Sequence, residues 1–285
     1  MRIQTLFILL LLGAHLIRAE AEVPERFEPK LKEAIALLNQ VKVGSEILSK
    51  AKALGIPIEG GLVSKTDVTA QRVTSQGGAH AEELKFQTRV TIALDKAPVF
   101  QALDLVHELV HATEAKNNPF DPKLTAISYV QHGIEGAGGE AQAIATECAV
   151  GKSFSSSSFK ERLKADTLQL IKARCQFVWN AVPDPIRWTQ SFYSLGQYYE
   201  GFIENLLSLH RDAKAENNWL VKVDSRSPKF TSAVAHKPYP LALLEEYVAI
   251  TQKVCNRAKM SKIGRTLAST VALLKDRCES IGVEL

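Results

Sequence analysis

The 285-residue sequence lacks several features that would place it in a well-defined class of protein. Beyond its first residues, it contains no apolar run near the ~20 residues that cross a bilayer core. It has no basic run interleaved with aromatic residues, which argues against a nucleic-acid-binding surface. The formal net charge is only +4, and no internal repeat is present. Nearly half of the residues are apolar, so the chain can bury one large core or two smaller ones.

The N-terminus carries the one markedly apolar segment. Arg2 precedes the run L-F-I-L-L-L-L-G-A, and the small residues Ala19 and Ala21 follow it. This arrangement is typical of a secretory signal peptide, whereas a membrane anchor would need a longer apolar run. We expect cleavage after residue 19, or after residue 21, and a periplasmic or secreted protein with no membrane span. No cysteine follows the cut directly, which disfavours a lipoprotein.

Only four cysteines are present: Cys148, Cys175, Cys255 and Cys278. An even number in an exported chain predicts two disulfides, and no pair has the close spacing of a zinc-binding motif. If residues 140–150 and 159–180 formed a helical hairpin, Cys175 would lie about a dozen residues beyond the position opposite Cys148. At ~1.5 Å per residue that is too far for a bridge. We therefore expect pairing with the C-terminal helices, although the sequence leaves the connectivity open.

Hydrophobic periodicity gives the first half of the chain a mixed character. Residues 30–54 have the apolar spacing of two helices, or of one helix broken near Gly44. Residues 62–74 are rich in Val and Thr and predict one or two strands, and residues 86–95 alternate apolar and polar side chains. Pro98 then begins a helix that ends before Asn117.

The second half is interpreted as helical. Residues 120–139 are rich in proline and glycine and predict a connection, and residues 140–150 predict a further helix. Helical patterns then recur almost to the C-terminus. The expected fold class is α+β, with a small sheet and one helix against it. A serine-rich segment places a boundary after residue 152, between a core of residues 22–152 and an α-helical region of residues 153–285 that completes or covers a cleft.

The helix after Pro98 contains the run H-E-L-V-H, residues 107–111. Histidines four residues apart on a helix project in the same direction, so His107 and His111 can bind one Zn²⁺ ion. Glu108 is rotated by about 100° from His107 and can reach a water beside the metal, where it would act as a general base. The alternative is that both histidines are ordinary residues of an amphipathic helix without a metal.

Two segments carry a resemblance to a known family. V-T-I-A-L-D (residues 90–95) and L-D-L-V-H-E-L-V-H-A (residues 103–112) resemble the strand and active-site helix of zincin metallopeptidases. The resemblance covers about residues 84–150 and implies a zincin-like core. Glu114 and Asn117 occupy the positions where the metzincin branch has a glycine and a third histidine. The gluzincin branch, which takes its third ligand from a glutamate on a following helix, is therefore the better match.

Three glutamates are candidates for the third metal ligand that this resemblance implies. Glu140 is favoured because it begins a helix in which Ala141 and Ala143 permit close approach to the motif helix. Glu147 is the alternative, either as the ligand or as a group that contacts a ligand from outside. Glu135 lies in the glycine-rich connection. Each glutamate alone also fits a solvated helix residue.

Other residues have roles that the sequence leaves open. Asp104 and Glu114 lie on the metal-facing side of the motif helix and could accept the outer N–H of a ligand histidine. No motif selects a transition-state-stabilising residue among the candidates His132, His210, His236, Tyr193, Tyr198, Tyr199 and Tyr247. The resemblance also implies that the strand of residues 86–95 is an edge strand that holds an extended peptide.

The prediction for function is zinc-dependent hydrolysis of peptide bonds, with a peptide or protein as substrate. One alternative is an exported, non-catalytic binding module with a zincin-like fold. Another is a zinc amidase that acts on cell-wall peptides through similar chemistry. The sequence defines neither the cleavage specificity nor the oligomeric state.

Overall fold

The computed structural model describes residues 29–74, 82–114, 118, 121–156, 159, 163–181, 192, 239–260 and 268–284. The expected signal peptide lies outside these ranges. Among the described residues, no helix has the length and apolar character needed to cross a membrane. The fold is α+β, as predicted, with a small sheet and a largely helical remainder.

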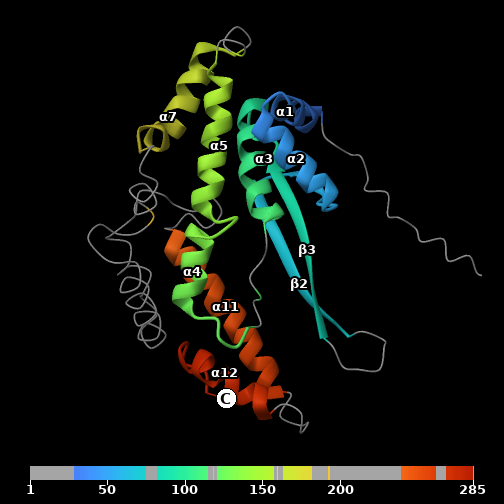
Figure 1. Ribbon diagram of the computed structural model, residues 1–285, viewed down its shortest axis with the longest axis vertical. Coiled ribbons are helices and arrows are strands. Elements are labelled where there is room, and N and C mark those ends of the chain that lie inside the picture. The colour runs from blue at the N-terminus through green and yellow to red at the C-terminus, as the bar shows by residue number, and fades with distance from the viewer. Residues whose placement is uncertain are drawn as a thin grey trace, which may run out of the picture.

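The N-terminal half is built around one long helix (Figure 1). Two helices, α1 (Pro29–Asn39) and α2 (Lys42–Ala53), come first, and α3 (Pro98–Thr113) follows the sheet. Helix α3 begins with Pro98. Proline is tolerated there because the N–H groups of the first helical turn have no intrahelical acceptor, so the N–H that proline lacks costs no hydrogen bond. It packs between α1, α2 and the sheet on one side and helix α5 (Glu140–Phe154) on the other.

The sheet has three strands in the order β1-β3-β2, formed by β1 (Ile58–Gly61), β2 (Lys65–Thr74) and β3 (Glu82–Ala93). Strand β1 pairs parallel to β3, and β2 pairs antiparallel to it. The strand expected at residues 86–95 is confirmed, but its expected place at an edge is wrong. The reason is β1, whose glycines obscured it in the sequence. A Cβ atom at Gly61 would lie 2.4 Å from the Thr91 side chain, so only glycine permits this pairing.

Of the two expectations for residues 30–54, the structure confirms two helices, and the break between them falls before Gly44. The chain turns at Gln40 and Val41, and Gly44 lies inside α2. A Cβ atom there would lie 2.4 Å from Leu38. The glycine therefore serves the close approach of α2 to the end of α1 rather than a break in the helix.

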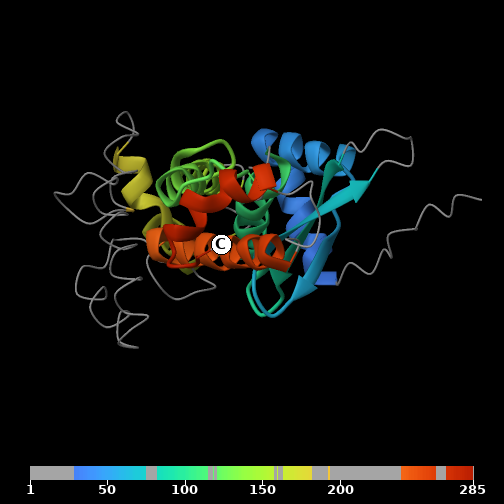
Figure 2. The ribbon, with the colours of Figure 1, turned by 90° about the horizontal axis from the view of Figure 1, so that it is seen from below.

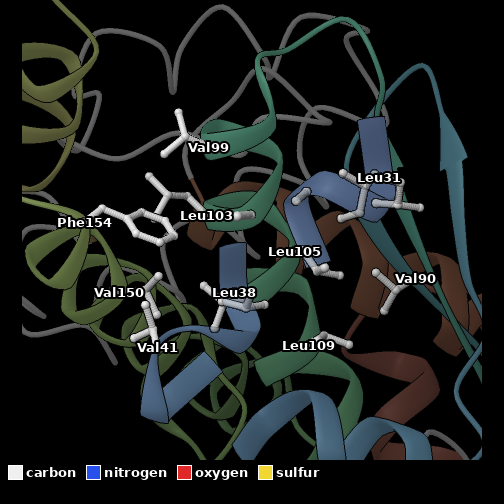
Figure 3. Packing of buried hydrophobic residues seen from close by; sticks show 14 of the residues in the cluster. Leu31, Leu38, Val41, Val90, Val99, Leu103, Leu105, Leu109, Val150 and Phe154 are labelled. Carbon is white, nitrogen blue, oxygen red and sulfur yellow. The ribbon is translucent and has the colours of Figure 1, made fainter. Parts of the chain in front are cut away.

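A hydrophobic core surrounds α3 (Figure 3). Leu103, Leu105 and Leu109 of α3 are fully buried, and they pack with apolar side chains from α1, β3 and α5. Gln101 and Asp104 are also buried, so α3 is enclosed nearly all round. This packing fixes the helix that carries the H-E-L-V-H run.

The helical half contains one element that the sequence analysis missed. Helix α4 (Ala126–Glu135) lies within the stretch interpreted as a connection. Its N-terminus is stabilised by a capping box in which the side chains of Thr125 and Ser128 each accept from the other's backbone N–H. Glu135 is therefore the last residue of a helix and not part of a loop. The expected boundary after residue 152 falls inside α5, which continues to Phe154.

Three further helices complete the described chain: α7 (Ala165–Ala181), α11 (Tyr239–Met260) and α12 (Ala268–Glu279). Helices α4, α5, α7 and α11 share a second core that includes Val130, Ile134, Val178 and Leu244. Seen from below, α11 and α12 lie together at one end of the molecule (Figure 2).

Two disulfides are present, as predicted, but the expected connectivity is wrong. Cys148 bonds to Cys175, which joins α5 to α7, and Cys255 bonds to Cys278, which joins α11 to α12. The Cys148–Cys175 pair looked too distant in the sequence because one helix was expected to end at residue 150 and the next to begin at residue 159. Because α5 continues to Phe154 and α7 begins only at Ala165, the position opposite Cys148 moves toward Cys175.

Candidate metal centre

The α3 helix brings the two motif histidines together, with their ring planes at 75° to each other. His107 and His111 lie one turn apart, and their Nε2 atoms are 3.2 Å from each other. Glu140, the first residue of α5, faces both rings. One carboxylate oxygen of Glu140 lies 3.3 Å from His107 Nε2, and the other lies 3.4 Å from His111 Nε2. The structure thus brings together the three residues favoured as metal ligands.

The far sides of both rings are held by other groups. His107 Nδ1 lies 3.1 Å from Glu147 Oε2, and His111 Nδ1 lies 2.7 Å from the carbonyl oxygen of Gly138. Because a carbonyl only accepts hydrogen bonds, His111 Nδ1 carries a proton that it donates. Each Nε2 atom is therefore left to face the space shared with Glu140.

The residue whose carbonyl oxygen accepts the hydrogen bond from His111 must be a glycine. Gly138 has a φ of +72°, in the left-handed region, and a Cβ atom there would lie 2.6 Å from Glu114 Cβ. Its backbone N–H donates to Gln142 Oε1 at 2.9 Å. The turn before α5 is thereby fixed, with its carbonyl directed at His111.

The donor atoms fit a tetrahedral zinc ion. Ligand atoms about 2.0–2.1 Å from such an ion lie about 3.3–3.4 Å from one another. The two Nε2 atoms are 3.2 Å apart, close to such an edge, and the Glu140 carboxylate lies 3.3 Å from one of them through Oε2 and 3.4 Å from the other through Oε1. Glu140 Oε2 is buried and has no hydrogen-bond partner among the described residues. Two imidazoles and one carboxylate also form a donor set that suits catalytic zinc.

Electrostatics at these residues is consistent with an exchange of protons for a cation. Burial opposes a charge on His107, but the carboxylates of Glu140 and Glu147 beside its ring raise its pKa well above 6.5. Burial also acts to raise the pKa of Glu140, and His111 and His107 lower it to a value below its ordinary one. Without a cation, His107 therefore holds a proton near Glu140, and a metal ion would displace it.

Glu108 lies beside this group and is held by the sheet. Thr66 of β2 places its Oγ1 atom 2.8 Å from Glu108 Oε2 and 2.9 Å from the Glu108 carbonyl oxygen. Burial raises the pKa of Glu108 above 4.5, an effect that His107, His111 and the hydrogen bond from Thr66 only partly oppose. A raised pKa makes this carboxylate a stronger base than an exposed glutamate.

The role that the sequence left open for Asp104 and Glu114 falls to other groups. Asp104 forms ion pairs with Lys96 and Arg174, and Glu114 pairs with Lys50 at 2.7 Å. The outer nitrogens of the two histidines contact Glu147 and the Gly138 carbonyl oxygen instead. The group that contacts His107 from outside is Glu147, because α5 places it two turns after Glu140 on the same face.

Sequence reasoning also missed Tyr239, the first residue of α11. Burial, followed by the charge of Glu140 and a hydrogen bond with it, raises the pKa of Tyr239 above 10.0. Its hydroxyl thus lies beside the third candidate ligand, and no local pattern would have selected it. Among the earlier candidates, Tyr247 donates instead to the Leu124 carbonyl oxygen, and His132 lies in α4. The others, Tyr193, Tyr198, Tyr199, His210 and His236, lie outside the described residues.

No protein-family model, no curated protein and no solved structure matches this chain.

Proposed function

We propose that the protein is a zinc-dependent peptidase that hydrolyses peptide bonds, with His107, His111 and Glu140 as metal ligands. One observation carries the proposal. The Nε2 atoms of the two histidines are 3.2 Å apart, close to the edge of a zinc tetrahedron, and the Glu140 carboxylate lies 3.3–3.4 Å from both, with Glu108 on the same helix as the histidines. The side chains of all three are 13–18% exposed, so a small molecule can approach them.

The residues divide the chemistry between them. Bound zinc would act as a Lewis acid and would lower the pKa of a water at the site. Glu108 takes the proton of the attacking water and later gives it to the leaving amine, and its raised pKa suits both transfers. Tyr239 presents a neutral hydroxyl beside Glu140, where it can donate a hydrogen bond to charge that develops on the substrate oxygen.

The surroundings of Glu108 suit an extended peptide. Strand β2 is an edge strand of the described sheet, and its Thr66 contacts Glu108 directly. The backbone of an edge strand can pair with a peptide. Further along the sheet, a groove of about 930 Å³ lies where β2 and β3 pass the C-terminal end of α3, with Val68, Phe86 and Ala112 in its lining, and Glu108 is not among the described residues that line it. Val68 is 42% exposed and offers an apolar contact for a substrate side chain.

The proposal also places the protein outside the cytoplasm. Two disulfides join its helices, and such bonds persist in oxidising compartments. This agrees with the signal peptide expected at residues 1–19.

The test of the proposal is a Glu108→Gln variant with its zinc content measured. We expect one zinc per chain in both proteins and a fall of about 10²–10⁴-fold in the hydrolysis of casein and of a peptide library, because the base is lost. The control is Glu46→Gln, since Glu46 is 64% exposed on α2 and forms an ion pair with Lys42 on the same helix. Full activity in Glu108→Gln would refute the mechanism.

Two further results separate the alternatives. Glu140→Gln should abolish zinc binding, whereas Glu147→Gln should only weaken it, because Glu147 contacts the outer nitrogen of His107. A zinc-loaded wild type that cleaves cell-wall fragments but not casein would establish an amidase. A zinc-loaded wild type that is inert on both would favour the binding module.

A further inference from the structure

A chain of polar contacts extends from the candidate metal centre through two buried carboxylates to a partly exposed arginine of α7. Glu147 contacts His107 through Oε2, and its other oxygen pairs with Nε of Arg174. Arg174 also donates from Nη2 to Asp104 Oδ1 at 3.0 Å. Both carboxylates are nearly fully buried, with side-chain exposures of 4%. Buried carboxylates need such partners, so Arg174 fixes the position of the Glu147 carboxylate next to His107.

Arg174 belongs to a different helix from either carboxylate. Asp104 lies on α3 and Glu147 on α5, and Arg174 connects both to α7. Its side chain is 37% exposed, so water can compete for the guanidinium. The ion pairs alone are therefore a weak attachment, and the position of Arg174 depends on how firmly α7 is held against α5.

The first disulfide holds the two helices together at this point. Cys148 and Cys175 directly follow Glu147 and Arg174 in the sequence, so the covalent bond lies one residue from the ion pair on each helix. Trp179 Nε1 adds a hydrogen bond of 2.9 Å to the Cys148 carbonyl oxygen. Gly151 permits the close contact, because a Cβ atom there would lie 3.0 Å from Ile171. The link keeps the guanidinium near Glu147 at a high effective concentration.

We infer that Arg174 and the Cys148–Cys175 disulfide together position the metal ligand His107 by holding Glu147 against its Nδ1 atom. The inference rests on the proposed function, since it assigns a role toward the bound metal. Arg174 is a positioning residue that acts through Glu147, and it does not contact substrate. The disulfide then has a function in metal binding in addition to its effect on stability.

The experiment measures the zinc dissociation constant of the full mature chain by competition with a chelator. Arg174→Gln should weaken zinc binding by about 10–100-fold, the usual effect of losing a partner that holds a ligand. Replacing Cys148 and Cys175 by alanine should weaken binding in the same direction. Combining both changes should add little, because they act through one contact. Substitution of Co²⁺ should also give an altered visible spectrum in Arg174→Gln, which would report a changed ligand geometry.

The chain provides matched controls. The second disulfide, Cys255–Cys278, closes a stretch of similar length, with a sequence separation of 23 against 27, but it joins α11 to α12. Its removal should destabilise the protein to a similar extent and leave zinc affinity unchanged. Arg89→Gln is the control for charge, since Arg89 pairs with Glu59 on the exposed face of the sheet. Melting temperatures of the metal-free proteins identify variants that have lost their fold.

The outcomes distinguish this inference from the proposed function. If the wild type binds no zinc, the proposed function fails and this inference fails with it. If the wild type binds zinc and Arg174→Gln binds it equally tightly, the inference alone is overturned. Equal losses of affinity on removal of either disulfide would also overturn it, because they would indicate a general effect of stability. Should the cysteine variant fail to fold, Arg174→Gln, which keeps both disulfides, decides the question.

Discussion

The hydroxyl of Thr66 provides a sharp test of how the sheet serves the proposed chemistry. Its Oγ1 atom lies 2.8 Å from Glu108 Oε2 and 2.9 Å from the Glu108 carbonyl oxygen, so its one proton is shared between these two acceptors of Glu108. Thr66→Val removes the hydroxyl and preserves the branched shape that suits a strand. The carboxylate of Glu108 is then free to rotate away from the attacking water.

The expected loss follows from the strength of this contact. A hydrogen bond to a charged group contributes about 1.5–3 kcal/mol, and each 1.4 kcal/mol changes a rate tenfold. We therefore expect kcat to fall by about 10–100-fold in Thr66→Val. The KM value should change little, because the hydroxyl acts on the base and not on substrate binding. The zinc content should remain that of the wild type, since no metal ligand is changed.

The assay is steady-state hydrolysis of a peptide substrate by the zinc-loaded variants. Thr66→Ser restores the hydroxyl and should recover most of kcat. Thr91→Val is the matched control, because Thr91 belongs to β3 and lies opposite Lys65, next to Thr66 in the ladder. In a Glu108→Gln background, Thr66→Val should have no further effect. A kcat within twofold of the wild type in folded, zinc-loaded Thr66→Val would refute the reasoning.

Three more variants test other parts of the structure. Gly138→Ala should destabilise the protein by about 1–3 kcal/mol and weaken zinc binding, because the φ of residue 138 is +72° and the new Cβ would crowd Glu114. Thermal unfolding measures the loss of stability, and competition with a chelator measures the zinc affinity. Asp104→Asn should cost about 2 kcal/mol at neutral pH. Burial acts to raise the pKa of Asp104, but Arg174, Lys96 and Ser64 lower it below 3.8. The stability that the wild type gains over Asp104→Asn should therefore be complete above pH 3.8 and be lost as the pH falls through the pKa of the folded state. Melting temperatures of the two proteins from pH 7 to 3 check this. Tyr239→Phe should lower kcat by about 10–100-fold with zinc retained, and an unchanged kcat would remove Tyr239 from the mechanism.

Sequence patterns predicted the helices and strands whose signals lie within the element itself. The alternation through residues 86–95 and Pro98 at the start of the next helix defined β3 and α3, because each signal lies within its own element. Glu140 was selected for its small neighbours, Ala141 and Ala143, and the structure brings it to the two histidines. These inferences needed only the period of a helix or strand and the size of adjacent side chains.

The remainder depended on contacts between distant parts of the chain. Strand β1 pairs with β3 across a long separation, so nothing near Gly60 indicated that β3 is central. Thr66 reaches Glu108 from 42 residues away, and Tyr239 reaches Glu140 from the far side of the helical half. Only α4 had a usable local signal, the capping pair of Thr125 and Ser128 before an apolar spacing, which the neighbouring prolines and glycines obscured.

Strand β2 lies at an edge of the sheet in the described part of the chain, so its backbone could also pair with a second copy of the protein. An edge strand that can accept a peptide can also accept the same strand of another copy, which leads to aggregation. Lys65 and Asp67 lie on the face of β2 opposite Thr66, are 39% and 51% exposed, and pair at 2.8 Å. Charged side chains on an edge strand hold water and disfavour close packing of a second strand against that face. The same two residues would therefore limit edge-to-edge pairing of two copies while leaving the backbone of β2 accessible to a short peptide.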